Sequence, residues 1–370
     1  MSLKKKISHT LLNLPGYHTN RKIVVIESDD WGSIRMPSRE VYEKLVGKGI
    51  RVDKLAFNRY DCLASEDDLT ALFQVLHSVK DKNNNSAIIT ANTIVANPDF
   101  EKIKASNFTE YHYEPFTETL KRYPKHKGAF KLWQKGMNEK VFKPQFHGRE
   151  HLNVTRWMKA LKENVGNARL AFELGMYDLS EGNQITEDSY MDTLNFKNEN
   201  EFAFQNQSIV EGLDLFEKIF GYKSTTFIAP CYIWDSKLNK ILSENGVKAI
   251  QGGWFQLEPK PGANHNFKKR FHYTGECNKH SQSYLVRNVS FEPSINSSEN
   301  IKDEVLNRME FLFRMKKPVI ISSHRLNYIG FIDAKNRDVN LNLFAELLQQ
   351  IVKRWPDVEF MSSDKLATIL

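Results

Sequence analysis

Eight short apolar runs recur along the chain, and helical patterns separate most of them. The runs cover residues 22–28, 86–92, 142–148, 224–230, 247–253, 283–289, 318–324 and 357–363. Apolar runs of this length, bounded by polar or turn-forming residues, are typical of buried strands. The alternation of strand and helix predicts parallel βα units in an α/β protein. Seven or eight such units favour a barrel over an open sheet.

The helical patterns are delimited by residues that start or stop helices. In residues 235–246, Asp235 is expected to cap the helix and Gly246 to end it. Similar apolar stripes occupy residues 67–81, 303–318 and 342–356. No Gly-rich phosphate-binding sequence follows the first run, which argues against a doubly wound nucleotide-binding sheet.

Two segments interrupt this rhythm of strands and helices. Residues 93–140 are rich in aromatic side chains, and residues 164–205 are polar and rich in Asn. The chain shows no internal repeat and no low-complexity linker. We therefore expect one barrel domain over residues 1–370, with both segments as insertions that decorate it.

The composition is that of a soluble globular protein, with 41% hydrophobic and 26% charged residues. The net charge of +7 is scattered, and the tight basic clusters are residues 4–6 and 268–270. The second cluster alternates with aromatic residues, so a nucleic-acid surface is conceivable there, but a solvated loop explains it more simply. We expect no nucleic-acid partner.

The cysteines and the apolar runs bear on the compartment. Cys62, Cys231 and Cys277 are widely spaced and show neither a metal-binding spacing nor a paired framework, which is typical of a reducing compartment. No run approaches the roughly 18 apolar residues that span a bilayer. We expect a cytoplasmic protein without a membrane span, although a trimmed chain could have lost a targeting segment. The oligomeric state stays open.

Two adjacent carboxylates follow the first apolar run, in the sequence KIVVIESDDWGS. Acidic residues after a strand often only cap a helix or solvate a loop. Asp29 and Asp30, however, come directly out of a buried run, where like charges repel and desolvation is costly. A metal ion beside them would compensate both effects.

Histidines stand at the ends of two further runs. His147 lies near the end of the third run and His151 just after it, and their spacing of four places two imidazoles on one side of a helical turn. His324 ends the seventh run. In a parallel barrel the carboxyl ends of all strands meet at one face, where active sites form. Each feature alone is weak, since a lone His in an apolar run is usually a satisfied core residue, but together they would converge.

The set of residue types matches a hydrolytic metal site. Two His and one carboxylate form a common catalytic zinc shell that leaves a position open for water. Zinc can lower the pKa of that water to about 7. A second carboxylate can then take a proton, and a His across the site can give one to the leaving group.

The motifs also resemble those of the polysaccharide deacetylase (carbohydrate esterase) superfamily. SDDWG matches its Asp-Asp motif, HGREH its His-x-x-x-His motif, and IAPCY and SSH match two later motifs in part. The resemblance runs from about residue 20 to the end and implies a distorted (β/α)7 barrel. It implies Asp29 as base and His324 as acid. The metal, most simply zinc with nickel, cobalt or manganese as alternatives, would be held by Asp30, His147 and His151.

The chain departs from the family pattern around these residues. Ile228 stands where the family has an Arg, and Gly148 replaces a Ser or Thr. The fourth motif, expected at residues 251–254, lacks its carboxylate. Arg35, Arg149 and Arg325 are candidates for the missing guanidinium.

The expected function is that of a metal-dependent hydrolase. Its substrate would be an N- or O-acetylated sugar or polysaccharide, which loses an acetyl or similar acyl group. Trp31, Tyr232 and Trp254, together with Pro230, lie at or just past strand ends and are expected to contact the sugar, although each aromatic ring could equally be rim packing. The alternative is a non-catalytic carbohydrate-binding barrel that keeps the fold and the metal site but has lost turnover.

Overall fold

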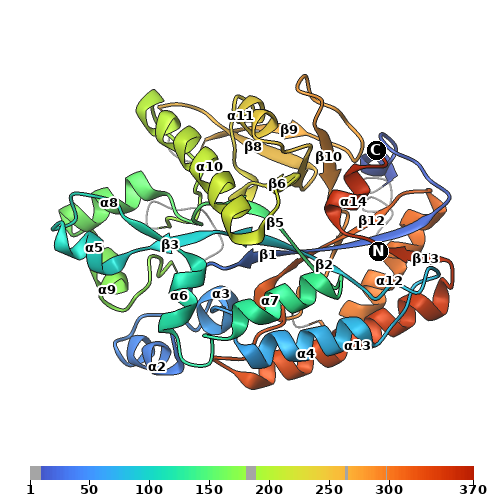
Figure 1. Ribbon diagram of the computed structural model, residues 1–370, viewed down its shortest axis with the longest axis horizontal. Helices are drawn as coiled ribbons and strands as arrows, with labels where there is room; N and C mark the ends of the chain where they lie inside the picture. The colour runs from blue at the N-terminus through green and yellow to red at the C-terminus, as the bar shows by residue number, and fades with distance from the viewer. Residues whose placement is uncertain (1–9, 181–188, 263–265, 297) are drawn as a thin grey trace.

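The computed structural model describes residues 10–180, 189–262, 266–296 and 298–370 (Figure 1). A parallel sheet runs through its centre, in the order β10-β7-β6-β5-β2-β1-β12-β11, and β13 pairs with β1. The strands of this sheet are β1 (Lys22–Trp31), β2 (Ile89–Ile94), β5 (Phe142–Gly148), β6 (Thr226–Ile228), β7 (Ala249–Gly252), β10 (Ser283–Val286), β11 (Val289–Ser290), β12 (Val319–His324) and β13 (Val358–Phe360). Each of the eight predicted runs contains at least part of one of these strands.

The sheet closes into a barrel because its two end strands are parts of one segment. Only two residues separate β10 from β11. The backbone N–H of Arg287 donates to Gly252 of β7 at 2.8 Å, and that of Asn288 donates to Ile320 of β12 at 3.0 Å. The segment therefore bridges β7 and β12, and the sheet order returns to its starting point. The predicted distorted (β/α)7 barrel is confirmed.

The barrel interior and its outer layer are separate hydrophobic clusters. Successive residues of a strand face opposite sides, so Ile23 and Val25 point inward while Val24 and Ile26 point toward the helices. The inner cluster also holds Leu366 of α14 (Ser363–Ala367), which closes the amino-terminal end of the barrel. The opposite, carboxyl end is left to polar side chains.

Helices surround the barrel, and α4, α7 and α13 lie side by side along one edge of the view in Figure 1. The outer helices are α4 (Glu66–His77), α7 (Ala129–Asn138), α10 (Glu199–Phe220), α11 (Leu238–Glu244), α12 (Ile301–Arg314) and α13 (Ala334–Arg354). The predicted cap at Asp235 is wrong. Its carboxylate accepts from the N–H of Lys237 in a turn, and α11 begins one residue later.

The two segments that interrupt the sequence rhythm contain parts of the regular fold. Residues 93–140 end in α7, which packs on β5 as a crossover helix of the barrel. Residues 164–205 run into α10, which also packs on β5 as a crossover helix. Residues 181–188 of the second segment lie outside the described residues. Side chains from both segments, such as Phe116 and Phe172, join the outer hydrophobic cluster of the barrel.

The remaining elements lie in the connections. They are α2 (Arg39–Gly47), α3 (Ala56–Tyr60), β3 (Ala96–Pro98), α5 (Phe100–Ala105), β4 (Tyr113–Pro115), α6 (Phe116–Arg122), α8 (Val154–Glu163), α9 (Ala168–Glu173), η1 (Pro230–Tyr232), β8 (Phe255–Pro259), β9 (Phe267–Phe271) and η2 (Arg325–Asn327). The β3–β4 and β8–β9 pairs are antiparallel ribbons outside the barrel sheet.

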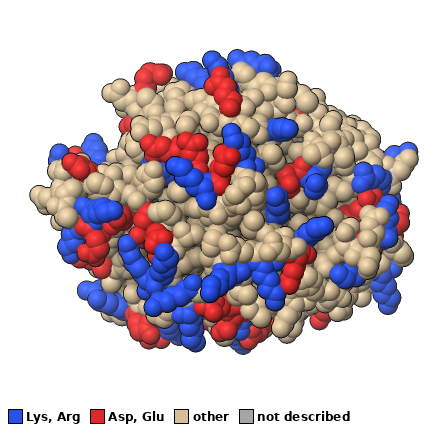
Figure 2. Space-filling view, in the orientation of Figure 1, with Lys and Arg blue, Asp and Glu red and all other residues tan. Residues whose placement is uncertain are grey.

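Charged residues of both signs are interspersed on the face shown in Figure 2. The basic cluster at residues 268–270 lies in β9, where Arg270 pairs with Glu258 at 2.6 Å. The cluster at residues 4–6 lies outside the described residues. In the part of the chain that the structure describes, every helix is too short or too polar to cross a membrane.

Candidate active site

A bulge at the end of β1 brings two neighbouring carboxylates into one cavity. In a regular strand Asp29 and Asp30 would face opposite sides of the sheet. The register of β1 against β2 shifts between Ser28 and Trp31, and Asp30 has a φ of 72°. Asp tolerates this left-handed conformation better than most residues. The bulge turns Asp30 around, so both carboxylates line the same cavity at the carboxyl end of the barrel.

Gly32 fixes the end of this bulge against β2. Its φ is 84°, and a Cβ atom placed on it would lie 2.3 Å from the carbonyl oxygen of Ile94. Real Cβ atoms do not approach a backbone oxygen so closely, so only glycine fits here. The Gly of the SDDWG sequence is therefore required by the geometry that presents the Asp pair.

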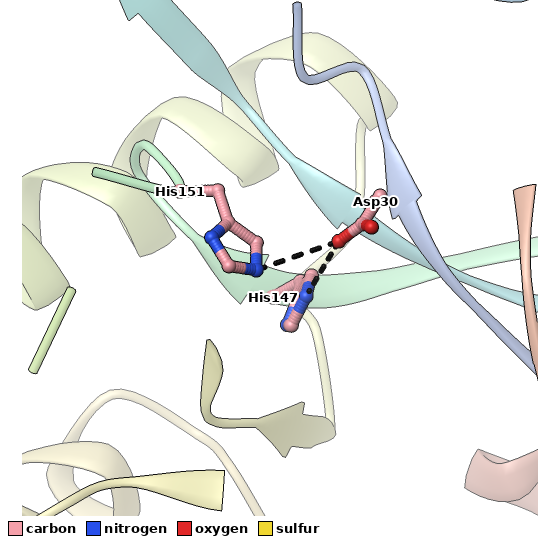
Figure 3. A group of neighbouring side chains, drawn as sticks. All are labelled: Asp30, His147 and His151. Carbon is pink, nitrogen blue, oxygen red and sulfur yellow. Dashed lines mark ion pairs between the residues drawn. The ribbon is translucent and has the colours of Figure 1, made fainter. Parts of the chain in front are cut away.

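The carboxylate of Asp30 faces both predicted histidine ligands, as Figure 3 shows. Its Oδ1 atom is 3.4 Å from Nε2 of His147 and 3.5 Å from Nε2 of His151. One ligand atom from each of the three residues lies within 4.8 Å of the others, and all three side chains are buried. The predicted convergence of β1 and β5 at this point is observed.

A loop, and not a helical turn, brings the two histidines together. His147 belongs to β5, which ends at Gly148, and residues 149–153 form a loop before α8 begins at Val154. Gly148 has a φ of 134° and turns the chain there. The prediction that helical geometry pairs the histidines is wrong, although the pairing itself is present.

The protonation and hydrogen bonding of the histidines fit metal ligation. Nδ1 of His147 donates to the carbonyl oxygen of Ile228 at 2.9 Å, which leaves the lone pair of Nε2 for a ligand. This Nε2 atom is buried and makes no hydrogen bond to any described residue. Burial lowers the pKa of His151 to about 3, against the pull of Asp30, and so favours the neutral imidazole that ligation needs. Two imidazole nitrogens and one carboxylate suit a divalent transition metal.

Asp29 is held by an arginine that the sequence analysis did not single out. Arg287 donates from Nη1 to Oδ2 of Asp29 at 2.7 Å and from Nη2 to Oδ1 at 2.6 Å. Asn92 also donates to Oδ1, at 2.7 Å. Burial acts to raise the pKa of Asp29, but Arg287 outweighs it and brings the value down to about 2. Asp29 is therefore a carboxylate at neutral pH.

Arg287 occupies the short link between β10 and β11, where the barrel closes. Its Nε also donates to Glu27 at 2.6 Å, and Glu27 accepts a second hydrogen bond from Ser363 at 2.8 Å. Arg287 lies inside the sixth apolar run, SYLVRNV, and a charged residue within an apolar run was the available signal.

The three arginines proposed for this role have other partners or positions. Arg149 is paired with Glu150 and Arg325 with Asp61. Arg35 lines the cavity that contains the Asp pair, but it does not contact Asp29.

His324 reaches the site from the end of β12. Its Nε2 is 3.9 Å from Oδ2 of Asp29, and its Nδ1 donates to Glu292 at 2.7 Å. Burial acts to lower the pKa of His324, but Glu292, together with Asp29 and Asp30, outweighs it and raises the value to about 10. Glu292, in the loop after β11, is thus the carboxylate that holds His324. Nothing in the local sequence around Glu292 marks it.

All five residues predicted to carry the chemistry line one cavity of about 170 Å³, and Tyr232 lines it with them. Tyr232 also faces a second cavity of about 1130 Å³, which contains Trp254. Its hydroxyl accepts a hydrogen bond from Arg287 at 3.1 Å, and its φ of 57° places it in the left-handed region. Pro230 is buried at the start of η1 and does not line the smaller cavity.

Trp31 does not lie at the site. It is 1% exposed, and its indole N–H donates to the hydroxyl of Ser28 at 2.9 Å. Its ring packs edge-on against Trp133 and Phe142 in the outer hydrophobic cluster. The expected contact with a sugar is therefore wrong, because the bulge that presents Asp30 turns the next side chain into the core.

Solved structures with a similar fold include polysaccharide deacetylases. A probable polysaccharide deacetylase from Pseudomonas aeruginosa PAO1 has 9% identity and a TM-score of 0.46, with 94% of this chain and 91% of that chain covered. A putative polysaccharide deacetylase from Mycobacterium smegmatis has 9% identity and a TM-score of 0.44, with 96% and 93% covered.

A larger protein also matches over part of its length. The 4-alpha-glucanotransferase from Thermococcus litoralis has 8% identity and a TM-score of 0.45, and the match covers 95% of this chain but 40% of that one. No protein-family model matches the chain. No curated protein matches it either.

Proposed function

We propose that the protein is a metal-dependent hydrolase that removes an acetyl or similar acyl group from an N- or O-acetylated sugar or polysaccharide. The observation that carries this proposal is one small cavity lined by a metal-type donor set, an ionised carboxylate and a cationic imidazole. These are the groups that hydrolysis of an amide or ester requires.

Each residue has a role that its contacts support. Asp30, His147 and His151 would hold one divalent ion, most simply zinc, with nickel, cobalt or manganese as alternatives. When bound, such an ion polarises a carbonyl oxygen and lowers the pKa of a coordinated water. Asp29 takes a proton from the attacking water, and His324 gives one to the departing amine or alkoxide.

The protonation states of the two proton-transfer groups fit these roles at neutral pH. Asp29 is ionised because Arg287 lowers its pKa by more than burial raises it. His324 is protonated because Glu292, with Asp29 and Asp30, raises its pKa by more than burial lowers it. The base is thus free to accept a proton and the acid carries one to donate. Arg287 and Glu292 also fix the orientation of the groups that they bind.

These two partners weigh against a barrel that only binds carbohydrate. The chief support for that alternative is the loss of an Arg and a carboxylate from their usual sequence positions. Arg287 and Glu292 contact Asp29 and His324 from other positions, at 2.6 Å and 2.7 Å. A site with these contacts in place favours turnover over binding alone.

The compartment and the partners follow from the same proposal. We place the protein in the cytoplasm, because Cys62, Cys231 and Cys277 are free thiols in the described chain. An acetylated carbohydrate is its proposed partner. We propose no nucleic-acid partner, and of the basic residues of β9 Arg270 is paired with Glu258 within the protein.

The test is acetate release from a panel of N- and O-acetylated sugars by zinc-reconstituted protein. Asp29→Asn and His324→Ala should each lower the rate by roughly a hundredfold or more. His112→Ala, which removes a partly exposed His paired with Glu110, is the matched control and should leave the rate unchanged. Equal rates for the wild type, Asp29→Asn and His324→Ala would end the mechanism proposed here.

A further inference from the structure

One arginine in the candidate cavity is buried without a close ion pair. Arg35 lines the cavity that contains Asp30 and His324, and its side chain is 9% exposed. Its guanidinium lies 5.4 Å from the ring centroid of Phe57, and that centroid lies 5.2 Å from the ring centroid of His324, with the two rings nearly perpendicular. Arg35 therefore stands on the same wall of the cavity as the proposed acid.

The nearest carboxylates are too far from Arg35 to accept a hydrogen bond. Nε of Arg35 is 3.8 Å from Asp61, and Nη1 is 4.0 Å from Asp178. Nη1 is buried and makes no hydrogen bond to any residue that the structure describes. A buried, charged N–H group of this kind is costly unless something else accepts from it.

Both carboxylates already accept hydrogen bonds from other groups. Arg325 donates to the two oxygens of Asp61 at 3.0 and 2.9 Å. Ser180 donates to Asp178 from its backbone N–H at 2.8 Å and from its hydroxyl at 3.1 Å. Burial raises the pKa of Asp61 and of Asp178 despite the neighbouring arginines, which further weakens their compensation of Arg35.

Arg35 differs in this respect from the other arginines of the barrel mouth. Arg287 and Arg325 each grip a carboxylate with two parallel hydrogen bonds. The planar fork of a guanidinium matches a carboxylate better than it matches a single hydroxyl. Only an anion also neutralises the positive charge of the guanidinium. No carboxylate among the described residues completes Arg35 in this way, and a carboxylate on the substrate would do so.

We propose that Arg35 anchors the substrate by binding a carboxylate on the acetylated sugar. This inference rests on the proposed function for the reaction and names the class of substrate. The preferred substrate is an acidic sugar, such as an N-acetylated hexosaminuronic acid, rather than its neutral counterpart.

The binding test uses two sugars that cannot be deacetylated and that differ in one group. Calorimetry of the zinc-reconstituted protein should show methyl β-D-glucuronide binding about tenfold or more tightly than methyl β-D-glucoside. Arg35→Met should remove this preference and leave the affinity for the glucoside within about twofold. Arg35→Lys should keep part of the preference. Arg59→Met removes an exposed arginine of α3 and should keep all of it.

Several results would overturn the assignment of Arg35. These are equal affinity of the wild type for both sugars, no measurable binding of the glucuronide, or an undiminished preference in Arg35→Met. The last result would mean that the carboxylate binds elsewhere, for example on the metal. If Arg35→Met does not fold, as judged by its melting curve, the comparison of the two sugars on wild type and Arg35→Lys decides the question.

A parallel assay separates this inference from the proposed function. Acetate release is measured from the methyl glycosides of N-acetylglucosamine and N-acetylglucosaminuronic acid. A binding preference without release from either sugar would sink the hydrolase and leave the anchor standing. Equal acetate release from both sugars, without any binding preference, would support the hydrolase and overturn the role of Arg35 as an anchor.

Discussion

Arg287 and Asp29 lie 258 residues apart in sequence and form a bidentate ion pair at the point where the barrel closes. The same guanidinium donates to Glu27, so one cation compensates two carboxylates of β1. All three side chains are buried. Closure of the barrel and ionisation of the proposed base therefore depend on the same residue.

Removing this guanidinium should cost stability as well as activity. Arg287→Met leaves two buried carboxylates without their cation, and the free energy of unfolding should fall by roughly 3–5 kcal/mol. Replacing Glu27 by Gln in the same chain should recover part of the loss, because one uncompensated charge is removed. Denaturant unfolding of the three proteins measures both effects. A loss below about 1 kcal/mol in Arg287→Met would contradict the account of this pair.

Glu292 should control the pH at which activity is lost on the alkaline side. His324 must be protonated to act as an acid, so the rate falls as pH rises through its pKa. Glu292 raises that pKa. Glu292→Gln should therefore move the alkaline limb of the pH–rate profile to lower pH, whereas Glu292→Asp should largely restore it. A uniform drop in rate at every pH, with the limb unmoved, would show that Glu292 has only a structural role.

Gly32 should not tolerate any side chain. Ala at this position meets both the strain of a φ of 84° and the carbonyl oxygen of Ile94. We expect Gly32→Ala to lower the free energy of unfolding by about 2–5 kcal/mol. Gly47, the last residue of α2, has open space around it, and Gly47→Ala should be neutral or stabilising by up to about 1 kcal/mol. Thermal or denaturant unfolding that gives equal effects for both would refute the argument from geometry.

A carboxylate far from the site should make stability depend on pH. Glu359 of β13 accepts hydrogen bonds from Arg21 at 2.9 and 2.7 Å and pairs with Lys82. The hydrogen bonding from Arg21 is the main cause that lowers the pKa of Glu359 to about 2. Because the folded pKa is lowered, the stabilisation is present above the unfolded value of about 4.3 and is lost as pH falls toward 2.

Glu359→Gln should therefore be less stable than the wild type at pH 7, and the difference should disappear near pH 2. Glu43→Gln is the control, because Glu43 pairs with Arg39 in solvent and should contribute less than about 1 kcal/mol at any pH. Unfolding curves recorded from pH 7 to pH 2 check the prediction. A difference for Glu359→Gln that stays constant over this range would contradict it.

The barrel and the convergence of the five proposed site residues on one cavity could be predicted because both depend on local sequence. Each apolar run marks a strand. In a parallel barrel the carboxyl ends of the strands meet at the face that carries the site, so a residue at the end of a run is expected to lie there. Asp30, His147 and His324 could thus be placed together without knowing a single contact. The order of the strands and the positions of the five residues follow this logic in the structure.

The contacts around those residues could not be predicted in the same way. Arg287 meets Asp29 only because one segment bridges β7 and β12, and Glu292 meets His324 through a loop whose path depends on that closure. Trp31 faces the core because the bulge at Asp30 reverses the strand alternation, and the alternation itself is what the sequence displays. Long-range closure and a local irregularity are both invisible to periodicity.

Metal binding is the most direct test of the proposed site. The wild type, His147→Ala and the control His112→Ala are stripped with a chelator and reconstituted with zinc. Elemental analysis counts the zinc bound per chain, and the affinity of each protein for zinc is measured as well. We predict one zinc ion per chain in the wild type and in His112→Ala, and none in His147→Ala. The reason is that Nε2 of His147 is buried and has no hydrogen-bond partner among the described residues, so its lone pair is available to the metal. A wild type that binds no zinc, or a His147→Ala variant that binds it with unchanged affinity, would contradict the account.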